Sequence, residues 1–552
     1  MPDRSNLGVV LSGAVVLFVV IFWRLGAPSF WDPDEAHYAE TSRELVATGD
    51  WLAPHYNDQL FFDKPILFHW LQAASMGLAG PTEFSARLVP AIAAGLLVVV
   101  TAWTGVVLLS TDAAVVAALV LATNPAVFAL ARYAILDPLF TLFLFGGAAL
   151  VAVAALERRR RGLQWWGYTM IALAVLTKGP LALVLCGLAT GLVALWSADV
   201  RRGLLELRLF AGLALVVALA LPWFIYMWLR FGDAFTVGYL LDENLRLYAT
   251  NRFGPGPSMW FYFRVLAVGL VPWTALLAGR LLDDVRAALR RDGTLDSVEI
   301  LLWGWTIAIV GFFTASRFKL DHYVFPAAPA LCLICGRSWS ALRQRPRDSH
   351  QVGARIGLQL VGPTMMAVAL VGGYLLAARL LLPKTALLAP LAIGLAGADM
   401  TVRLNLGGGR LPRAPWAVVG AMTLTYVALV LSVLPALEER KVVPDMARWV
   451  AAQAAGTDRV ASYRLDRWNT AFRFYVGRHV AMIDAPEEAR TLFQGTAPFY
   501  CTMLRSAYEE FVAQGVPLRI VYQREGMWVT SGRALWQRGF TPTQFVVVSR
   551  GP

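Results

Sequence analysis

A polar stretch near the N-terminus holds acidic and basic side chains of the types that catalyse group transfer. Residues 28–70 include Asp32, Asp34, Glu35, His37, Glu40, Asp50, Asp58, Asp63, Lys64 and His69. Carboxylates can deprotonate or orient an acceptor, and ammonium groups can hold a departing phosphate. The chain as a whole is 57% hydrophobic. A connection this long and this rich in charge therefore indicates the place where the chemistry occurs.

Later polar connections carry further candidate residues. Asp137 lies in ARYAILDP (131–138) and Lys178 in TKGP (177–180). The others are Arg246 and Arg252 in the loop at 231–258, and Lys319 and Tyr323 in SRFKLDHY (316–323). Two carboxylates and several cations on the same side of a membrane would be the set of groups that transfer of a sugar from a lipid phosphate requires.

Part of the first stretch also has a purely structural explanation. Asp32 can cap a helix, with Pro33 at the first helical position and Glu35 completing a capping box. Helix capping does not account for Asp34. At the second helical position an acidic side chain gains only a little from the helix dipole, so Asp34 is the candidate for chemistry in this turn.

Other charged residues have structural explanations too. Glu40 and Glu44 lie one helical turn apart and predict a solvated face. Lys64, beside an aromatic-rich stretch, can snorkel to the lipid headgroups or hold the phosphate of a lipid substrate. Asp137 can form a structural ion pair with Arg132 or take part in the reaction. Spacing alone leaves these alternatives open.

Composition predicts an integral membrane protein. Of 552 residues, 16% are charged, against about a quarter in soluble domains, and the mean hydropathy is +0.56. The net charge of +12 is explained by arginines in short loops between spans, where topology requires them. No basic patch interleaved with aromatic residues is found, so nucleic acid is not predicted as a partner.

Thirteen apolar runs are long enough to predict membrane spans. They cover residues 7–24, 86–109, 112–130, 136–156, 163–177, 179–197, 208–229, 259–280, 297–315, 322–340, 356–381, 385–402 and 414–436. Arginines recur in alternate connections, such as ERRRRG (157–162), and the positive-inside rule makes that side cytoplasmic. The first loop (27–84), the loop at 231–258 and everything after residue 436 then face outward.

After residue 436 the composition changes to that of a soluble domain. Predicted strands lie at 459–463, 479–483, 499–504, 518–523 and 544–549, and helical stretches such as 485–494 and 505–514 alternate with them. Such alternation is typical of a small α/β unit. The prediction is an all-α transmembrane domain, residues 1–436, followed by a C-terminal α/β domain, residues 437–552, that covers or selects something at the outer face.

The sequence resembles the GT-C integral-membrane glycosyltransferases, in the branch that joins bacterial aminoarabinose–lipid A transferases and protein O-mannosyltransferases. The motifs that carry the resemblance are PDEAHYAETSRELVATGDWLAPHYN (33–57), FFDKPILFHW (61–70), ARYAILDP (131–138), TKGP (177–180), ENLRLYATNRFGPGP (243–257) and SRFKLDHYVFP (316–326). They follow the family order across most of the membrane part. The acidic pair followed by an Asp/Glu-Lys-Pro step is specific in combination.

The resemblance implies a multi-pass protein of the bacterial inner membrane with its active site at the periplasmic face. It implies an undecaprenyl-phosphate-linked sugar as donor, with Asp34 as the catalytic aspartate and Asp137 as a second aspartate near the donor. By the same matches, Lys64, Arg246, Arg252 and Lys319 would bind the donor phosphate, and Glu35, Tyr38, Lys178 and Tyr323 would bind substrate.

Two departures from the aminoarabinose branch concern a metal. That branch usually has Glu-Lys-Pro where this chain has Asp63-Lys64-Pro65, and Glu-His where it has Glu243-Asn244. Those Glu and His positions are associated with a bound metal in the branch. The interpretation therefore requires no cofactor and keeps a divalent metal at Asp63 as an alternative.

The predicted function is transfer of aminoarabinose or a related sugar from undecaprenyl phosphate to lipid A or another envelope acceptor, by direct displacement at the anomeric carbon. A protein O-mannosyltransferase-like enzyme is an alternative, because the loop motifs are shared. A lipid or sugar transporter is a second alternative. Transporters place ionisable groups near the bilayer midplane and often contain repeats, whereas here the charges gather at the outer ends of spans.

Overall fold

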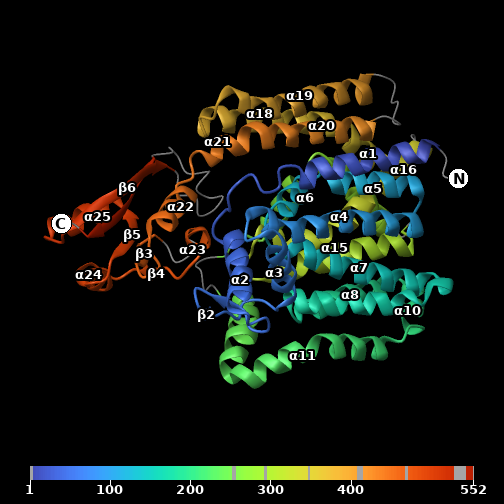
Figure 1. Cartoon of the computed structure of the whole chain (residues 1–552). Coiled ribbons are helices and arrows are strands. Elements are labelled where there is room, and N and C mark those ends of the chain that lie inside the picture. Colours follow the sequence, from blue (N-terminus) through green and yellow to red (C-terminus); the bar gives the residue numbers. More distant parts are fainter. Residues whose placement is uncertain are drawn as a thin grey trace.

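The computed structural model describes residues 4–250, 256–290, 295–345, 348–406, 414–465, 470–526 and 542–550. Long helices run side by side in a bundle, and a small sheet with its own helices lies beyond one end of that bundle (Figure 1). Arg252, one of the predicted phosphate ligands, lies outside the described residues.

The bundle is mostly α-helical, as the apolar runs predict. Its main helices are α1 (Arg4–Leu17), α4 (Glu83–Leu108), α5 (Thr111–Thr123), α6 (Pro125–Ala131), α7 (Asp137–Leu156), α8 (Leu163–Lys178), α9 (Leu181–Trp196), α10 (Ala198–Leu205), α11 (Leu209–Phe235), α13 (Phe261–Gly269), α14 (Thr274–Arg290), α15 (Ser297–Ala315), α16 (Ala328–Gln344), α17 (Val352–Gln359), α18 (Val361–Tyr374), α19 (Leu388–Thr401), α20 (Ala414–Ala428) and α21 (Leu434–Glu438). Helices α18, α19 and α20 lie along one margin of the bundle and α11 along the opposite one (Figure 1).

Many of these helices can cross a bilayer. Within the described residues, seven segments are long and apolar enough to do so: Glu83–Leu108, Asp137–Leu156, Leu209–Ala249, Ser297–Ala315, Ser349–Arg379, Lys384–Asn405 and Pro415–Glu438. Helices α5 and α6 together make a further apolar segment, bent by 57°. Leu11–Phe22 and Leu181–Trp196 are shorter apolar helices. The protein is therefore a multi-pass membrane protein.

Helices α7 and α8 approach each other closely through two glycines. A Cβ added at Gly147 would lie 2.9 Å from the Gly167 carbonyl oxygen, and one added at Gly167 would lie 2.9 Å from the Gly147 carbonyl oxygen. Small residues let helix backbones approach where lipid supplies no hydrophobic drive for association. This contact fixes the two helices that carry Asp137 and Lys178 relative to each other.

Several predicted runs do not form single α-helices, and two of them lie near charged segments. Residues 259–280 form two helices, α13 and α14, and Pro272, which has no backbone N–H to donate, lies in the break. The run 322–340 becomes α-helical only at Ala328, and the preceding residues form the 3-10 helix η4 (Asp321–Ala327). The segment that carries His322 therefore lies before the apolar helix α16.

The first loop forms a helix across the end of the bundle. Helix α2 (Asp34–Thr48) runs across the bundle axis there (Figure 1), and it is followed by the hairpin β1 (His55–Tyr56) and β2 (Gln59–Leu60) and by α3 (Leu67–Ala79). The predicted capping by Asp32 is wrong. The residue before the helix is Pro33, and no side chain caps this end.

Glu35 anchors α2 to α4 through a buried ion pair, so its predicted roles in a capping box and in substrate binding are wrong. Its Oε1 lies 2.5 Å from Arg87 Nε and its Oε2 2.9 Å from Arg87 Nη2. Glu35 is 0% and Arg87 1% exposed. The Ala134 N–H also donates to Glu35 at 3.0 Å. A paired carboxylate with no exposed surface is unavailable to a substrate.

The C-terminal segment forms a five-stranded mixed sheet in the order β4-β3-β5-β7-β6. Its elements are α22 (Val443–Gln453), β3 (Arg459–Tyr463), α23 (Thr470–Val476), β4 (Ala481–Ile483), α24 (Pro486–Gln494), β5 (Phe499–Leu504), α25 (Arg505–Ala513), β6 (Leu518–Gly526) and β7 (Thr543–Arg550). The five strands match the five predicted runs closely. Strand β3 pairs in parallel with β4 and β5, and β7 is antiparallel to β5 and β6.

Helix α23 docks on α2 through charged groups, so the predicted solvated face of α2 is wrong. Glu40 and Glu44 are 0% and 2% exposed. Both face Arg473 of α23, at 2.8 and 3.0 Å. Asp32 accepts hydrogen bonds from the Thr470 hydroxyl at 2.9 Å and from the Ala471 backbone N–H at 2.7 Å. The carboxylates that spacing assigns to water are thus buried against the C-terminal segment.

The buried Asp32 carboxyl should make the protein more stable as the pH falls from 8 to 6. Burial raises its pKa from 3.8 to about 7, although hydrogen bonds from Ala471 and Thr470 oppose that shift. Below pH 7 the folded state therefore holds a proton that the unfolded state has released, which stabilises it by at most about 1.4 kcal/mol per pH unit. Asp32→Asn should remove this part of the pH dependence. Melting curves of the two proteins in detergent at pH 6, 7 and 8 test this, and parallel curves would contradict it.

Candidate functional site

A buried ion pair joins the start of α7 to the end of α8. The Asp137 Oδ1 and Lys178 Nζ atoms lie 2.5 Å apart, and both side chains are buried. The other Asp137 oxygen lies 3.6 Å from Nε2 of His322 in η4. Three elements therefore bring a carboxylate, an ammonium group and an imidazole together at the α2 end of the bundle.

The alternative ion pair between Asp137 and Arg132 is wrong. The Arg132 guanidinium donates to the carbonyls of Ile21, Trp23 and Arg24 at 3.1, 2.9 and 3.2 Å. These carbonyls belong to the end of the first apolar helix and the turn after it, where backbone acceptors have no helical partner. Arg132 therefore ties the first helix to the bundle, and Asp137 pairs with a lysine 41 residues later.

Aromatic rings hold the Lys178 ammonium group in place. It lies 4.6 Å from the centre of the Tyr323 ring and 5.2 Å from that of Phe140. The faces of aromatic rings attract cations, most strongly where water is excluded. Tyr323, predicted to bind substrate, thus lies beside the ion pair.

The turn after Lys178 requires glycine. Gly179 has φ +87°, and a Cβ there would lie 1.9 Å from the Tyr239 hydroxyl and 3.9 Å from Pro65. Tyr239 belongs to the π-helix η3 (Thr236–Arg246), which follows α11. This close approach packs η3 and the Asp63-Lys64-Pro65 step against the end of α8.

Asp34 faces this cluster from the first turn of α2. It is half-buried. Burial raises the pKa of its carboxyl, as do the charges of Asp137 and Asp321, while His322 and Lys64 lower it. The residues whose charges act on Asp34 therefore come from α7, η4 and the first loop. A carboxylate with a raised pKa, partly open to solvent and close to cations, has the properties of a general base.

Tyr38 lies one helical turn after Asp34 and is half-buried. Burial, followed by the charges of Asp137 and Asp34, raises the pKa of its phenol. Tyr38 therefore remains a neutral hydroxyl beside the two aspartates, as its predicted substrate-binding role requires.

Lys64 lies between two elements at the edge of the cluster. Its Nζ donates to the Asp63 carbonyl at 3.0 Å and lies 3.7 Å from the Glu243 carboxylate in η3. The Asn244 side chain, which takes the place of the family histidine, donates to the Tyr239 carbonyl at 2.7 Å. The cation beside the Glu243 carboxylate is therefore the Lys64 ammonium group.

Two other predicted phosphate ligands have partners of their own. Arg246 pairs with Asp242 at 2.6 Å on the exposed side of η3. Lys319 donates to the Ser316 carbonyl at 2.5 Å. Neither cation forms part of the Asp137–Lys178 cluster.

Sequence reasoning missed His322 as a site residue. It contacts both Asp137 and Asp321, the latter at 3.3 Å. Burial lowers the pKa of His322, but these two carboxylates raise it by more. The available signal was its place directly before Tyr323 in SRFKLDHY.

An apolar groove of about 400 Å³ opens beside the cluster. Its lining comes from α8, α9, α11 and η3 and includes Pro180, Phe224, Trp228 and Leu240. Pro180 is two residues from Lys178, so part of the groove wall comes from the turn that follows this lysine. Its shape and composition suit a hydrocarbon chain.

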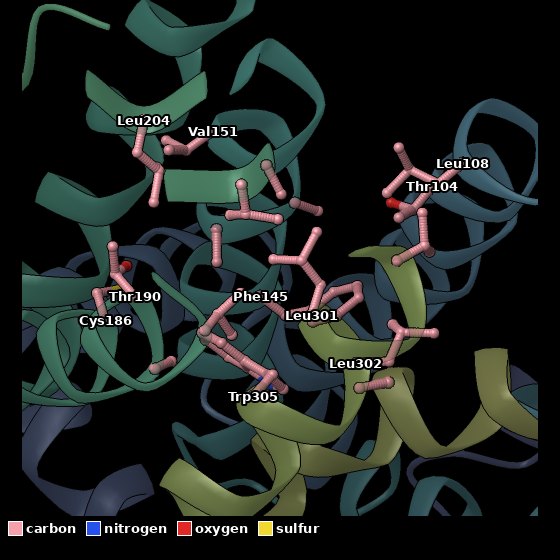
Figure 2. A pocket seen from close by; sticks show the side chains of 18 of the residues that line it. Thr104, Leu108, Phe145, Val151, Cys186, Thr190, Leu204, Leu301, Leu302 and Trp305 are labelled. Atoms are coloured by element: carbon pink, nitrogen blue, oxygen red, sulfur yellow. The ribbon is translucent and has the colours of Figure 1, made fainter. Parts of the chain in front are cut away.

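A second cavity, of about 100 Å³, lies farther along α7 from Asp137. Figure 2 shows Phe145 and Trp305 lining it, together with Leu204, Leu301 and Thr104 from other helices. Its lining contains no acidic or basic side chain. The cavity therefore cannot supply the groups that sugar transfer needs, and the charged cluster is the candidate site.

The fold and the site define a multi-pass membrane protein with paired charges at one end of its helical bundle. The family model for dolichyl-phosphate-mannose-protein mannosyltransferases matches residues 11–283. The chain is 32% identical over 368 residues to the undecaprenyl phosphate-alpha-4-amino-4-deoxy-L-arabinose arabinosyl transferase of Pectobacterium carotovorum, a match that covers 65% of this chain and 64% of the relative. It is 31% identical over 383 residues to the transferase of that name from Pectobacterium atrosepticum, with 67% and 66% covered.

The fold has a solved counterpart. ArnT from Cupriavidus metallidurans, crystallised with undecaprenyl phosphate, matches with a TM-score of 0.77 and 22% sequence identity over 100% of both chains. In sequence, the matched part covers slightly less than two thirds of each curated relative. The predicted resemblance is confirmed: the chain is similar in sequence to the aminoarabinose transferases and, over residues 11–283, to the protein mannosyltransferase family, and its fold matches that of ArnT.

Lys178→Met should destabilise the bundle strongly because it leaves Asp137 buried without its ammonium partner. Breaking a buried ion pair on one side costs about 3–5 kcal/mol. His322, when protonated, can replace part of the lost charge, so the loss should be greater at pH 8 than at pH 6. Melting temperatures in detergent measure the effect. The double variant Asp137→Leu/Lys178→Met is the control and should recover most of the loss, and equal melting of the single and double variants would contradict the pairing.

Proposed function

We propose that this protein transfers a sugar, aminoarabinose or a related one, from undecaprenyl phosphate to lipid A or another envelope acceptor. The observation that carries the proposal is the position of Asp34 beside the Asp137–Lys178–His322 cluster. The relatives named for an undecaprenyl-phosphate-linked donor support the choice of donor. The chain is thus proposed to be a polyprenyl-phosphate-sugar-dependent glycosyltransferase.

The donor phosphate would lie between Lys64 and Lys178. The Lys64 ammonium, 3.7 Å from Glu243, has a loose partner that a phosphate can displace, whereas Lys178 is held tightly by Asp137. As the sequence predicts, Arg246, Arg252 and Lys319 are proposed as further ligands of the donor phosphate. Cations aimed at the departing phosphate stabilise the charge that develops on it. The polyprenyl chain would follow the apolar groove beside Pro180.

Asp34 would act on the acceptor. An oxygen of the acceptor attacks the anomeric carbon, the bond from that carbon to the phosphate oxygen breaks, and the lipid phosphate leaves with the electron pair. If the nucleophile is a hydroxyl, its proton passes to Asp34, and the raised pKa of this carboxyl favours that transfer. If the nucleophile is a phosphate, it is already ionised, and Asp34 positions it. Asp137 would hold Lys178 in place, and Tyr38 and Tyr323 would contact substrate.

We propose the topology that the sequence predicts: thirteen spans in residues 1–436, with the first loop and a C-terminal α/β domain, residues 437–552, on the periplasmic side of the bacterial inner membrane. The placement of α2, α3 and the sheet at the same end of the bundle supports this arrangement (Figure 1).

A protein O-mannosyltransferase-like activity is the second candidate, because the family model that matches residues 11–283 is that of protein mannosyltransferases. The two activities differ in acceptor. Mass spectrometry of lipid A and of envelope proteins, from cells with and without the gene, separates them. A transporter is disfavoured because the described charges of the site gather at one end of the bundle and not at its middle.

Asp34→Asn should lower kcat by about 100-fold or more, the usual effect of losing a general base. Lys64→Met should lower kcat/KM for the donor by a similar factor, because it removes a cation from the departing phosphate. The assay is transfer by purified protein in detergent with an undecaprenyl-phosphate sugar. Asp50→Asn is the matched control: Asp50 is in the same loop but pairs with Arg230 on α11. Full activity of either site variant would refute its assigned role.

We propose that catalysis needs no metal. Asp63 and Glu243, the acidic residues at the family's metal position, lie beside the Lys64 ammonium group, and the Asn244 amide is turned to a backbone carbonyl. This donor set fits a divalent ion poorly. Dialysis against EDTA should therefore leave kcat unchanged within twofold, and added Mg²⁺, Mn²⁺ or Zn²⁺ should not raise it. Loss of activity on dialysis, restored by one of these ions, would overturn this part of the proposal.

A further inference from the structure

Three carboxylates of the first loop converge on one arginine of the C-terminal segment. The Arg473 guanidinium lies 2.8 Å from Glu40, 3.0 Å from Glu44 and 3.3 Å from Asp58. Arg473 is 1% exposed, so most of the contact is shielded from water. Charges in such a place are costly unless they are paired. Arg473 is therefore a central contact between the two parts of the chain.

A second set of contacts holds the segment that leads into α2. Asp32 accepts hydrogen bonds from the first turn of α23, as described above. The buried Lys441 ammonium donates to the carbonyls of Ser29 and Phe30 at 2.9 and 3.3 Å. The Phe30 ring packs edge-on against Phe474 of α23, with ring centres 4.8 Å apart. The chain just before Asp34 is thus fixed by the C-terminal segment.

The clamped face of α2 differs from its site face. At 3.6 residues per turn, Asp34 and Tyr38 lie within about 40° of each other around the helix axis, and Glu40 and Glu44 lie about 120° and about 80° from Asp34 in the other direction. A helix of 15 residues is marginal without tertiary contacts. Glu35 joins α2 to α4 of the bundle, and Arg473 contacts α2 on another face, through Glu40 and Glu44.

We propose that Arg473 is a positioning residue for the transfer reaction: through Glu40 and Glu44 it holds α2 so that Asp34 meets the Asp137–Lys178–His322 cluster. This inference rests on the proposed function. It gives the C-terminal segment a part in building the active site, which goes beyond covering or selecting a substrate at its entrance.

The test compares full-length Arg473→Met with Arg478→Met as matched control. Arg478 belongs to the same segment, and within the described residues it donates to the Ala455 and Asp458 carbonyls of that segment. For Arg473→Met, hydrogen exchange in residues 34–48 should rise, and kcat should fall at least tenfold. KM for the donor should change less than threefold, because the ion-pair partners of Arg473 are Glu40, Glu44 and Asp58 and not Lys64 or Lys178, the proposed ligands of the donor phosphate. Arg473→Lys should restore part of kcat, and the control should match wild type.

Two results would overturn the proposal. One is unchanged exchange in residues 34–48 of Arg473→Met, which would mean that Arg473 does not hold α2. The other is increased exchange with full kcat, which would mean that the clamp does not serve catalysis. Inactive wild-type protein would contradict the proposed function instead, and the exchange data would still decide whether the clamp exists. If Arg473→Met does not purify, Thr470→Val, which removes one hydrogen bond to Asp32, should give the same pattern with a two- to fivefold fall in kcat.

Discussion

The site depends on the rule that every charge taken out of water at the end of an apolar bundle needs a counter-charge. Glu35 has Arg87, Asp137 has Lys178, and Glu40 and Glu44 have Arg473. Each pair joins two elements that are distant in the sequence. The pairs offset the cost of desolvating the charges, and they also specify how the elements are arranged. If one element were misplaced, a carboxylate would be buried without a counter-charge. The pairs fix α2, α4, α7, α8 and α23 in one arrangement.

Asp34 differs from the other carboxylates of α2 in this respect. Glu35, Glu40 and Glu44 are all paired, whereas in the described part of the chain no hydrogen bond or ion pair is found for the Asp34 side chain. It is also the one of the four that is partly exposed. A general base must be free to take a proton from a substrate, so a rigid frame of paired carboxylates around one unpaired carboxylate is what the proposed chemistry requires.

The elements of the fold could largely be predicted from local sequence. Apolar runs gave most helices within a few residues, and alternating patterns gave all five strands of the sheet, because both signals are periodic and short in range. The break in residues 259–280 is the clearest miss among the helices. A proline inside an apolar run does not by itself say whether the helix continues, since Pro90 lies within α4 without ending it.

The partners of the charged residues could not be predicted in the same way. Spacing suggested a cap for Asp32, a capping box for Glu35, water for Glu40 and Glu44, and Arg132 for Asp137. Each suggestion looked only a few residues away. Glu40 does pair with Arg43, three residues on, but Lys178, Arg87, Arg473 and Ala471 lie 41 to 439 residues from the carboxylates they contact. Residue type selected Asp34, Lys64, Asp137, Lys178 and Tyr323, and the structure brings these residues to the same end of the bundle.

The polar character of α2 therefore has two sources that the sequence does not separate. One face carries Asp34, the residue proposed to act on the acceptor, and the other docks the C-terminal segment through charges. An apolar docking face would pack as tightly, but an exposed apolar helix at the end of an apolar bundle favours the lipid surface. The paired carboxylates and Arg473 hold α2 in one register without an apolar face. The same charges that make this loop look catalytic are thus mostly those that place its one unpaired aspartate.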